Sequence, residues 1–319
     1  MRTFFITLIS CIILFACTKE YSAMGGHNYT DTTWKIPPVN DTAPVNLLLK
    51  KLQDPAQVDS FDIEYGCFLE LDHELEIYIP GSACVGGNGI PLKGMAKIEV
   101  IFLQKKGDFI RYERPTTSNH YLLETGGALY LHITQNGTPL KLAPGAFVSI
   151  RYKEPQAYSD MEVFFGDTTA NNTGNFDWFP AQDTSAVFVW ADSSTLELGY
   201  QLFSQKLEWI NCDYFRDSTI ARTGISTKLP VNYTNNNTAV FLVFKELRAV
   251  VRLSENVDQR LFESIQIPLG SKVEVVSLSQ LGNDLYMATK DLTVAGNDMI
   301  ELEPVKKTEA QIRDYLDGL

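Results

Sequence analysis

Apolar and polar residues alternate in short runs along most of the chain, and this period of two is typical of β-strands with one buried face. Leu129, Leu131 and Ile133 point to one side of such a strand while their neighbours point to the other, and residues 148–152 repeat the pattern. Asn136-Gly137 follows the first run and predicts a hairpin, because both residues tolerate the positive φ of a type I′ turn. Short strands separated by such turns predict an antiparallel β-sandwich.

The second half of the chain continues the β pattern. Residues 196–202 alternate like a strand of a sandwich core, and residues 240–244 form a continuous apolar strand. Residues 272–278 predict a further strand, which Gly282-Asn283-Asp284 turns into a strand over 285–290. This half of the chain therefore also predicts strands that pair with their neighbours in sequence.

A helix is predicted at the end of the chain, over residues 306–319. Thr308 and Gln311 have the spacing of a capping box, and Ile312 and Leu316 share an apolar face that we expect to dock on a sandwich. Together these patterns predict a mainly β protein, with two antiparallel β-sandwich regions in tandem and a short C-terminal helix.

The first residues have the layout of a secretory signal. One positive charge, Arg2, precedes a mostly apolar run over 4–16, which is too short to span a bilayer. The run ends in Leu14-Phe15-Ala16-Cys17, which resembles the lipobox of bacterial lipoproteins. That resemblance implies removal of residues 1–16 and acylation of Cys17, including palmitate-type chains, each buried methylene contributing roughly 0.8 kcal/mol to membrane binding. The alternative is an ordinary cleaved signal with a chance cysteine.

Thr18 follows the lipobox, and by the rules of the lipoprotein family this residue favours the outer membrane of the cell envelope. The leaflet that the protein would face is left open.

Composition divides the chain after residue 16 into four parts. These are a flexible tether rich in Gly, Asn, Thr and Pro over 17–44, a β-sandwich over 45–153, a second β-rich region over 154–305 with a further split allowed near 226, and the terminal helix over 306–319.

An ordered series of motifs in the first β region is similar to the ZU5-like domain of Bacteroidota envelope lipoproteins. The motifs lie at residues 57–61, 76–80, 88–94, 97–102, 106–110, 115–117, 123–127 and 134–142. The resemblance implies a β-sandwich with a structural or protein-interaction role and without a catalytic centre. It also implies that Cys84, which stands where that family has Phe, packs in the interior.

The chain of 319 residues has a formal charge of −12 and a sequence pI of about 4.8, with no large basic block. An acidic protein of this kind is a poor ligand for nucleic acid or for anionic lipid headgroups. We therefore expect no nucleic-acid partner. The membrane contact is expected to come from the acyl chains on Cys17 and not from a charged surface.

Three cysteines follow the anchor. Cys67 and Cys84 are close enough in sequence to close a short disulfide loop in an exported protein, which would contribute about 3 kcal/mol, with buried free thiols as the alternative. Cys212 lies in an apolar segment and is expected to be a buried, unreactive thiol.

Trp178, Trp190 and Trp209 lie in the middle of the chain among other aromatic residues. Exposed on one face, they would form a stacking platform for a glycan; buried, they would simply belong to a core. This leaves a glycan-binding lipoprotein as the alternative to a protein-interaction role.

The chain lacks the common catalytic and metal-binding motifs, including G-x-S-x-G, H-E-x-x-H, the phosphate-binding P-loop and paired C-x-x-C. Its four histidines are scattered. We therefore predict no enzyme activity, no cofactor and no metal site. The predicted function is that of a lipid-anchored envelope protein with a structural role or a protein partner, whose identity and oligomeric state the sequence leaves open.

Overall fold

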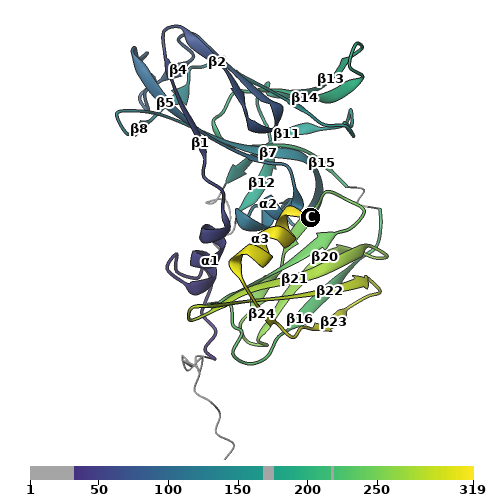
Figure 1. Cartoon of the computed structure of the whole chain (residues 1–319). Coiled ribbons are helices and arrows are strands. Elements are labelled where there is room, and N and C mark those ends of the chain that lie inside the picture. The colour runs from purple at the N-terminus through teal and green to yellow at the C-terminus, as the bar shows by residue number, and fades with distance from the viewer. Residues whose placement is uncertain (1–31, 168–175, 217–218) are drawn as a thin grey trace, which may run out of the picture.

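The chain folds into two β-sandwiches with a layer of helices between them (Figure 1). The computed structural model describes residues 32–167, 176–216 and 219–319. Four main sheets are numbered I to IV by their order in the layers, which is sheet I, sheet II, helices, sheet III, sheet IV. In Figure 1, sheets I and II form the upper part of the molecule and sheets III and IV the lower part. The mainly β architecture with a short C-terminal helix is thus as predicted.

The first sandwich consists of sheets I and II. Sheet I is formed, in spatial order, by β13 (Ala186–Asp192), β14 (Glu197–Ser204), β10 (Val148–Lys153), β3 (Leu75–Pro80) and β2 (Gly66–Leu71). Sheet II is formed by β1 (Gln57–Asp62), β5 (Met95–Leu103), β7 (Tyr121–Gln135), β15 (Glu208–Phe215), β11 (Glu162–Asp167) and β12 (Asp177–Pro180), with β6 (Thr117–Ser118) and β8 (Thr138–Pro139) on β7. The short strands β4 (Cys84–Val85) and β9 (Lys141–Leu142) pair beside them, and a 3₁₀ turn, η1 (Asp72–Glu74), joins β2 to β3.

The second sandwich consists of sheets III and IV. Sheet III is formed by β18 (Val250–Arg252), β17 (Thr238–Phe244), β21 (Lys272–Leu281), β22 (Asp284–Thr293) and β24 (Val305–Lys307). Sheet IV is formed by β19 (Ser254–Asn256), β20 (Leu261–Pro268), β16 (Arg222–Lys228) and β23 (Asp298–Glu301), and its β16–β23 pair is parallel.

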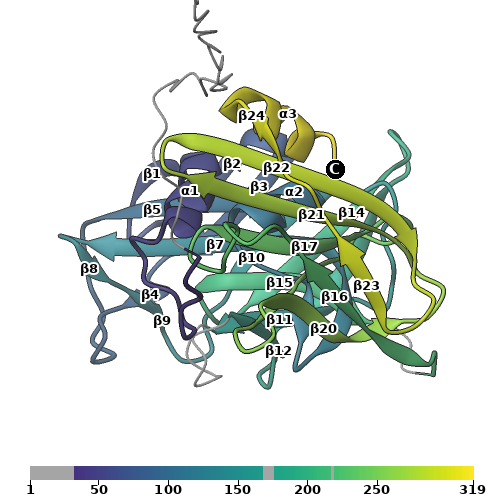
Figure 2. The ribbon, with the colours of Figure 1, turned by 90° about the horizontal axis from the view of Figure 1, so that it is seen from below.

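Three helices fill the space between the sandwiches: α1 (Pro44–Leu52), α2 (Lys106–Arg111) and α3 (Glu309–Asp317). In Figure 2, which shows the molecule from below, they lie together beside β21 and β22. Arg111 on α2 connects them, because it forms ion pairs with Asp54, just after α1, and with Asp317 at the end of α3. The α3 helix has the predicted capping box of Thr308 and Gln311.

Three hydrophobic cores follow from this layering. One lies between sheets I and II, and another between sheets III and IV. The third contains the apolar faces of the helices, the lower face of sheet II and the upper face of sheet III. The two sandwiches are therefore joined by a continuous apolar interior and not by a hydrated interface.

The alternation predicted from the sequence is confirmed in β7, where one face of the strand is more deeply buried than the other. Leu129, Leu131 and Ile133 are buried in the first core, while the residues between them are only partly buried. The hairpin at Asn136-Gly137 has positive φ at both residues. The apolar run in β17 is buried on both faces. Val240 and its alternate neighbours face the core between sheets III and IV, and the other residues face the helices.

The structure corrects the predicted boundary between residues 153 and 154. β10 pairs with β14 in sheet I, and β7 pairs with β15 in sheet II, so strands from both sides of that boundary complete the same sandwich. The chain passes from the first sandwich to the second between the end of β15 at Phe215 and the start of β16 at Arg222. This is close to the split that the sequence allowed near 226.

The predicted tether over 17–44 is also corrected in its second half. Trp34 packs against Phe262 with ring centroids 5.0 Å apart. The backbone of Lys35 exchanges two hydrogen bonds with the Asn235 side chain, of 2.9 and 2.7 Å. Residues 17–31 lie outside the described part of the chain.

Two helices occur where strands were expected. In α1, Pro44 occupies the first turn, and the buried residues Val45, Leu48, Leu49 and Leu52 follow the spacing i, i+3, i+4, i+7 of an amphipathic helix. The α2 helix is only six residues long, and a short helix of this kind carries a weak periodic signal.

Candidate interaction surface

The outer face of sheet I carries a row of aromatic side chains. Phe68 lies opposite Tyr78, Tyr78 opposite Ser149, and Ser149 opposite Phe203 in the strand ladders. Because directly opposed residues point to the same side of a sheet, these side chains form a row across β2, β3, β10 and β14. In each strand the flanking residues point inward to the first core.

Two further rings extend this row. Phe147 and Phe188 each meet the Phe203 ring edge-on, with centroid distances of 5.4 and 5.9 Å. Phe68 and Phe188 are each 57% exposed and Tyr78 is 47% exposed. We call these five residues, Phe68, Tyr78, Phe147, Phe188 and Phe203, the aromatic face.

A row of polar residues runs beside the aromatic face. Arg151 lies opposite both Gln201 and Glu76 in the ladders, and its guanidinium is 3.6 Å from the Glu76 carboxylate. The same guanidinium covers the ring of Trp190 at 4.1 Å. An apolar centre beside a charged margin is the composition typical of protein interfaces.

The three tryptophans predicted as a glycan platform do not share a face. Trp178 is fully buried in the helix-layer core, where its indole N–H donates a hydrogen bond to the Pro115 carbonyl. Trp209 is half-buried on the lower side of sheet II, and Trp190 lies on sheet I beneath Arg151. The predicted platform is therefore wrong as a set, because its members belong to opposite sides of the first sandwich.

The disulfide suggested for Cys67 and Cys84 is absent, and both residues are free thiols. Burial raises the pKa of each thiol to about 11. Cys84 is buried in the first core, as the family resemblance implied. Cys212 is fully buried, as predicted, and burial raises the pKa of its thiol well above the ordinary value.

A polar cluster is buried where β15 meets a bulge in β7. Asn211 donates a 2.6 Å hydrogen bond to Oδ2 of Asp213, and Thr125 donates a 2.9 Å hydrogen bond to Oδ1 of Asn211. Oδ1 of Asp213 has no hydrogen-bond partner among the described residues. Burial raises the pKa of the Asp213 carboxyl well above its usual range, so the neutral form is favoured.

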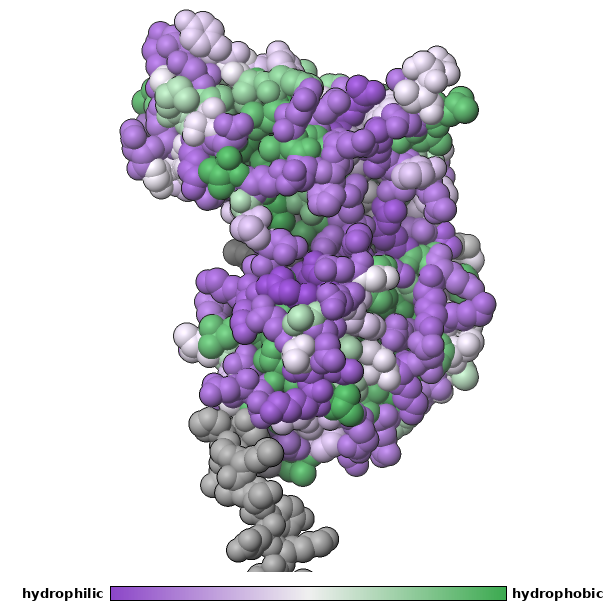
Figure 3. Space-filling model, viewed as in Figure 1, coloured by the Kyte–Doolittle hydropathy of each residue, from purple (hydrophilic) through white to green (hydrophobic). Residues whose placement is uncertain are grey.

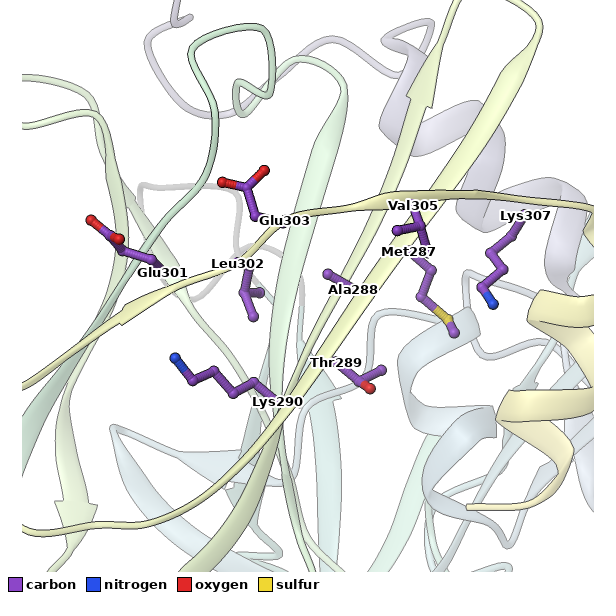
Figure 4. Close-up of a pocket in the computed structure, with 9 residues that line it drawn as sticks. All are labelled: Met287, Ala288, Thr289, Lys290, Glu301, Leu302, Glu303, Val305 and Lys307. Carbon is purple, nitrogen blue, oxygen red and sulfur yellow. The ribbon is translucent and has the colours of Figure 1, made fainter.

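A shallow cavity of about 440 Å³ lies where β24 diverges from β22 (Figure 4). Ala288 and Leu302 line its apolar part, while the side chains of Lys290 and Glu301 extend away from Ala288. Both acidic and basic side chains line the cavity, and their charged groups do not converge on one point in Figure 4. It therefore offers no clear centre for chemistry.

No helix in the described part of the chain is long and apolar enough to cross a membrane. Within residues 32–167, 176–216 and 219–319, no group of three or more His, Cys, Asp or Glu residues is placed to hold a metal ion. Comparison with family models, with curated proteins and with solved structures finds no match to this chain.

Sequence reasoning missed the aromatic face. Its members are far apart in the chain, and only the strand register brings them into one row. One signal was available: Tyr78 occupies the position between Ile77 and Ile79 where an alternating strand normally has a polar residue.

Proposed function

We propose that this chain is a lipid-anchored protein of the bacterial envelope that binds another envelope protein through the aromatic face, without catalysis. The observation that carries the proposal is a set of exposed and partly exposed aromatic side chains on the outer face of an outermost sheet. Soluble proteins rarely expose several large aromatic side chains close together on one face unless that face binds a partner. The ZU5-like motifs support the same role by resemblance.

The position of the aromatic face supports a partner away from the anchor. The described chain begins at the lower end of Figure 1, where Trp34 packs on the second sandwich, and sheet I forms the upper end. Residues 18–31, between the lipobox cysteine and this point, could span at most about 50 Å when fully extended. Acyl chains on Cys17 would thus hold the second sandwich near the membrane and direct the aromatic face outward.

The chemistry of the face favours a protein over a glycan. Phe147 and Phe188 meet Phe203 at interplanar angles of 75° and 74°, so the rings do not form a flat platform. The one tryptophan on this sheet, Trp190, is covered by Arg151. Figure 3 shows the side of the first sandwich, where apolar residues are mixed with polar ones, while the outer face of sheet I lies along its upper edge.

Site-specific photo-crosslinking in intact envelopes tests the proposal. A photoreactive phenylalanine analogue at position 68 or 188 is expected to give a discrete protein adduct. The same analogue at position 265 is the control, because Ile265 on β20 is 71% exposed but lies on the other sandwich. The adduct from position 68 should disappear in the Phe188→Ser and Phe203→Ser double variant and persist in Ile265→Ser.

Equal adducts from positions 188 and 265, or none from either position of the aromatic face, would contradict the protein-interaction role. The anchor is tested separately by fractionation. The Cys17→Ala variant should leave the membrane fraction, and a variant that stays with the membrane would contradict acylation at Cys17.

A further inference from the structure

Arg114 occupies an unusual position beside the helix layer. Its guanidinium carbon lies 4.3 Å from the ring centroid of Phe176 and 4.6 Å from that of Trp209. The two rings meet at an interplanar angle of 77°, so they form a corner that holds the guanidinium. The backbone of Arg114 is held as well, because its N–H donates to the Phe109 carbonyl behind the end of α2.

Among the described residues the guanidinium in this corner forms no ion pair, although the charge of Glu113 acts on it from beyond 4 Å. One hydrogen bond leaves it, a 3.1 Å contact from Nη1 to the Glu113 carbonyl, and its buried Nε has no hydrogen-bond partner in the described structure. No carboxylate of the described residues lies within 4.0 Å of it. By contrast, Arg111, Arg248 and Arg252 each form an ion pair with a carboxylate. Burial lowers the pKa of Arg114 to about 10, so the group still carries its charge at neutral pH.

Cation–π contacts offset part of the cost of burying this charge. Of the in-plane donors, Nη1 bonds the Glu113 carbonyl and Nε is buried, so an anion would have to meet the guanidinium at its Nη groups. An arginine fork recognises a carboxylate or another oxyanion through those donors. The corner therefore has the chemistry of a site for an anionic group.

A strip of aromatic rings continues from the corner along the lower side of sheet II. The Trp209 ring lies 5.1 Å from that of Tyr130, and the Tyr130 ring stacks on His132 at 5.8 Å with an interplanar angle of 10°. All three side chains are half-buried and so present part of their surface to solvent. Ring faces of this kind pack against the C–H faces of sugars, as they do against other flat apolar surfaces.

Two carboxylates border the strip. Glu99 lies opposite His132 in the ladder and pairs with Lys97 at 2.6 Å, and Glu208 precedes Trp209 in β15. Burial, followed by the charges of Glu208 and Glu99, raises the pKa of the Tyr130 hydroxyl. These carboxylates can accept hydrogen bonds from the hydroxyl groups of a sugar.

We propose that Arg114 and the strip of Trp209, Tyr130 and His132 bind an acidic glycan, with the carboxylate of a uronic-acid-type sugar on Arg114 and neighbouring sugars on the rings. This site is separate from the aromatic face of sheet I and lies on the other sheet of the first sandwich. The role proposed for the aromatic face does not depend on it.

Calorimetric titration of the full chain in detergent tests the site, with trigalacturonate as the probe. The fully methyl-esterified trisaccharide is the matched neutral probe, since it differs mainly in charge, and inorganic sulfate is the simple anion. Trigalacturonate is expected to bind at least about tenfold more tightly than the ester, as a charge-assisted hydrogen bond predicts. Sulfate is expected to bind more weakly than trigalacturonate.

The Arg114→Gln variant should lose at least about tenfold in affinity for trigalacturonate. Arg114→Lys keeps the charge but not the fork, and it should also weaken binding; it serves as the second variant if Arg114→Gln fails to fold. Arg222→Gln is the control, because Arg222 covers the Tyr121 ring at 4.9 Å away from the strip. Its affinity should equal that of the unmodified chain.

Three outcomes would overturn the proposal. The first is equal binding of trigalacturonate and its ester, the second is sulfate binding as tight as that of trigalacturonate, and the third is the absence of binding. A loss of affinity in Arg222→Gln equal to that in Arg114→Gln would also overturn it, because binding would then follow overall charge and not this corner.

Discussion

Truncating Leu48 in α1 should destabilise both sandwiches together. Leu48 is fully buried in the core that sheets II and III share with the helices. Leu48→Ala removes the equivalent of about three methylene groups, or roughly 2.4 kcal/mol at about 0.8 kcal/mol each. The cavity left behind adds to this, so the free energy of unfolding should fall by about 3 kcal/mol, within the 2–5 kcal/mol typical of such truncations.

The assay for this prediction is hydrogen exchange followed by mass spectrometry, read at β10 in the first sandwich and at β20 in the second. If the helix layer couples the sandwiches, slow amides in both strands should lose the same protection in Leu48→Ala. The matched control is Leu47→Ala in the same helix, since Leu47 is 48% exposed and should change stability by less than about 0.5 kcal/mol. Faster exchange in only one of the two strands would refute the argument that they unfold as one unit.

Two other measurements test buried groups. The folded-state pKa of Asp213 is raised above the unfolded value of about 3.9, so the folded chain retains a proton that the unfolded chain releases. The free energy of unfolding should therefore fall as pH rises above that value. Asp213→Asn should remove this slope and be more stable than the parent in urea melts at pH 8; unchanged pH dependence would contradict the assignment. Cys67, Cys84 and Cys212 should react slowly with a thiol reagent in the native protein at pH 8, because burial disfavours the thiolate. After denaturation without reductant, all three should react. A reaction of Cys212 alone would show that the other two form a disulfide.

The strands could be predicted because their signal is local. Alternation in β7 and the turn at Asn136-Gly137 depend on neighbours in sequence, and the capping box of α3 depends on residues three positions apart. The assignment of strands to sandwiches could not be predicted in this way. The pairing of β10 with β14, which places residues beyond 153 in the first sandwich, depends on long-range packing.

The helix α1 shows a different kind of error. Its apolar residues have helical spacing and Pro44 marks its start, so the signal is present, although the alternation over the rest of this region predicts strands. The candidate sites were less accessible. Trp209 was recognised as a candidate binding residue, but nothing in the sequence indicates that Arg114 lies against it, because the contact joins segments almost a hundred residues apart.

The helix layer also determines how an anchor would act on the rest of the molecule. From Trp34 onward the chain is packed on the second sandwich, and α1 then enters the core shared with sheet II. A tether attached at this end could turn the body as a whole, but it could not bring the aromatic face towards its own membrane without reversing the entire molecule. Two copies anchored in one membrane with their second sandwiches next to it would present their aromatic faces side by side, and packing these faces against each other would require both bodies to tilt over. This geometry favours a different protein as the partner of the aromatic face. Crosslinking at positions 68 and 188 distinguishes such a partner from self-association, because the two adducts differ in mass.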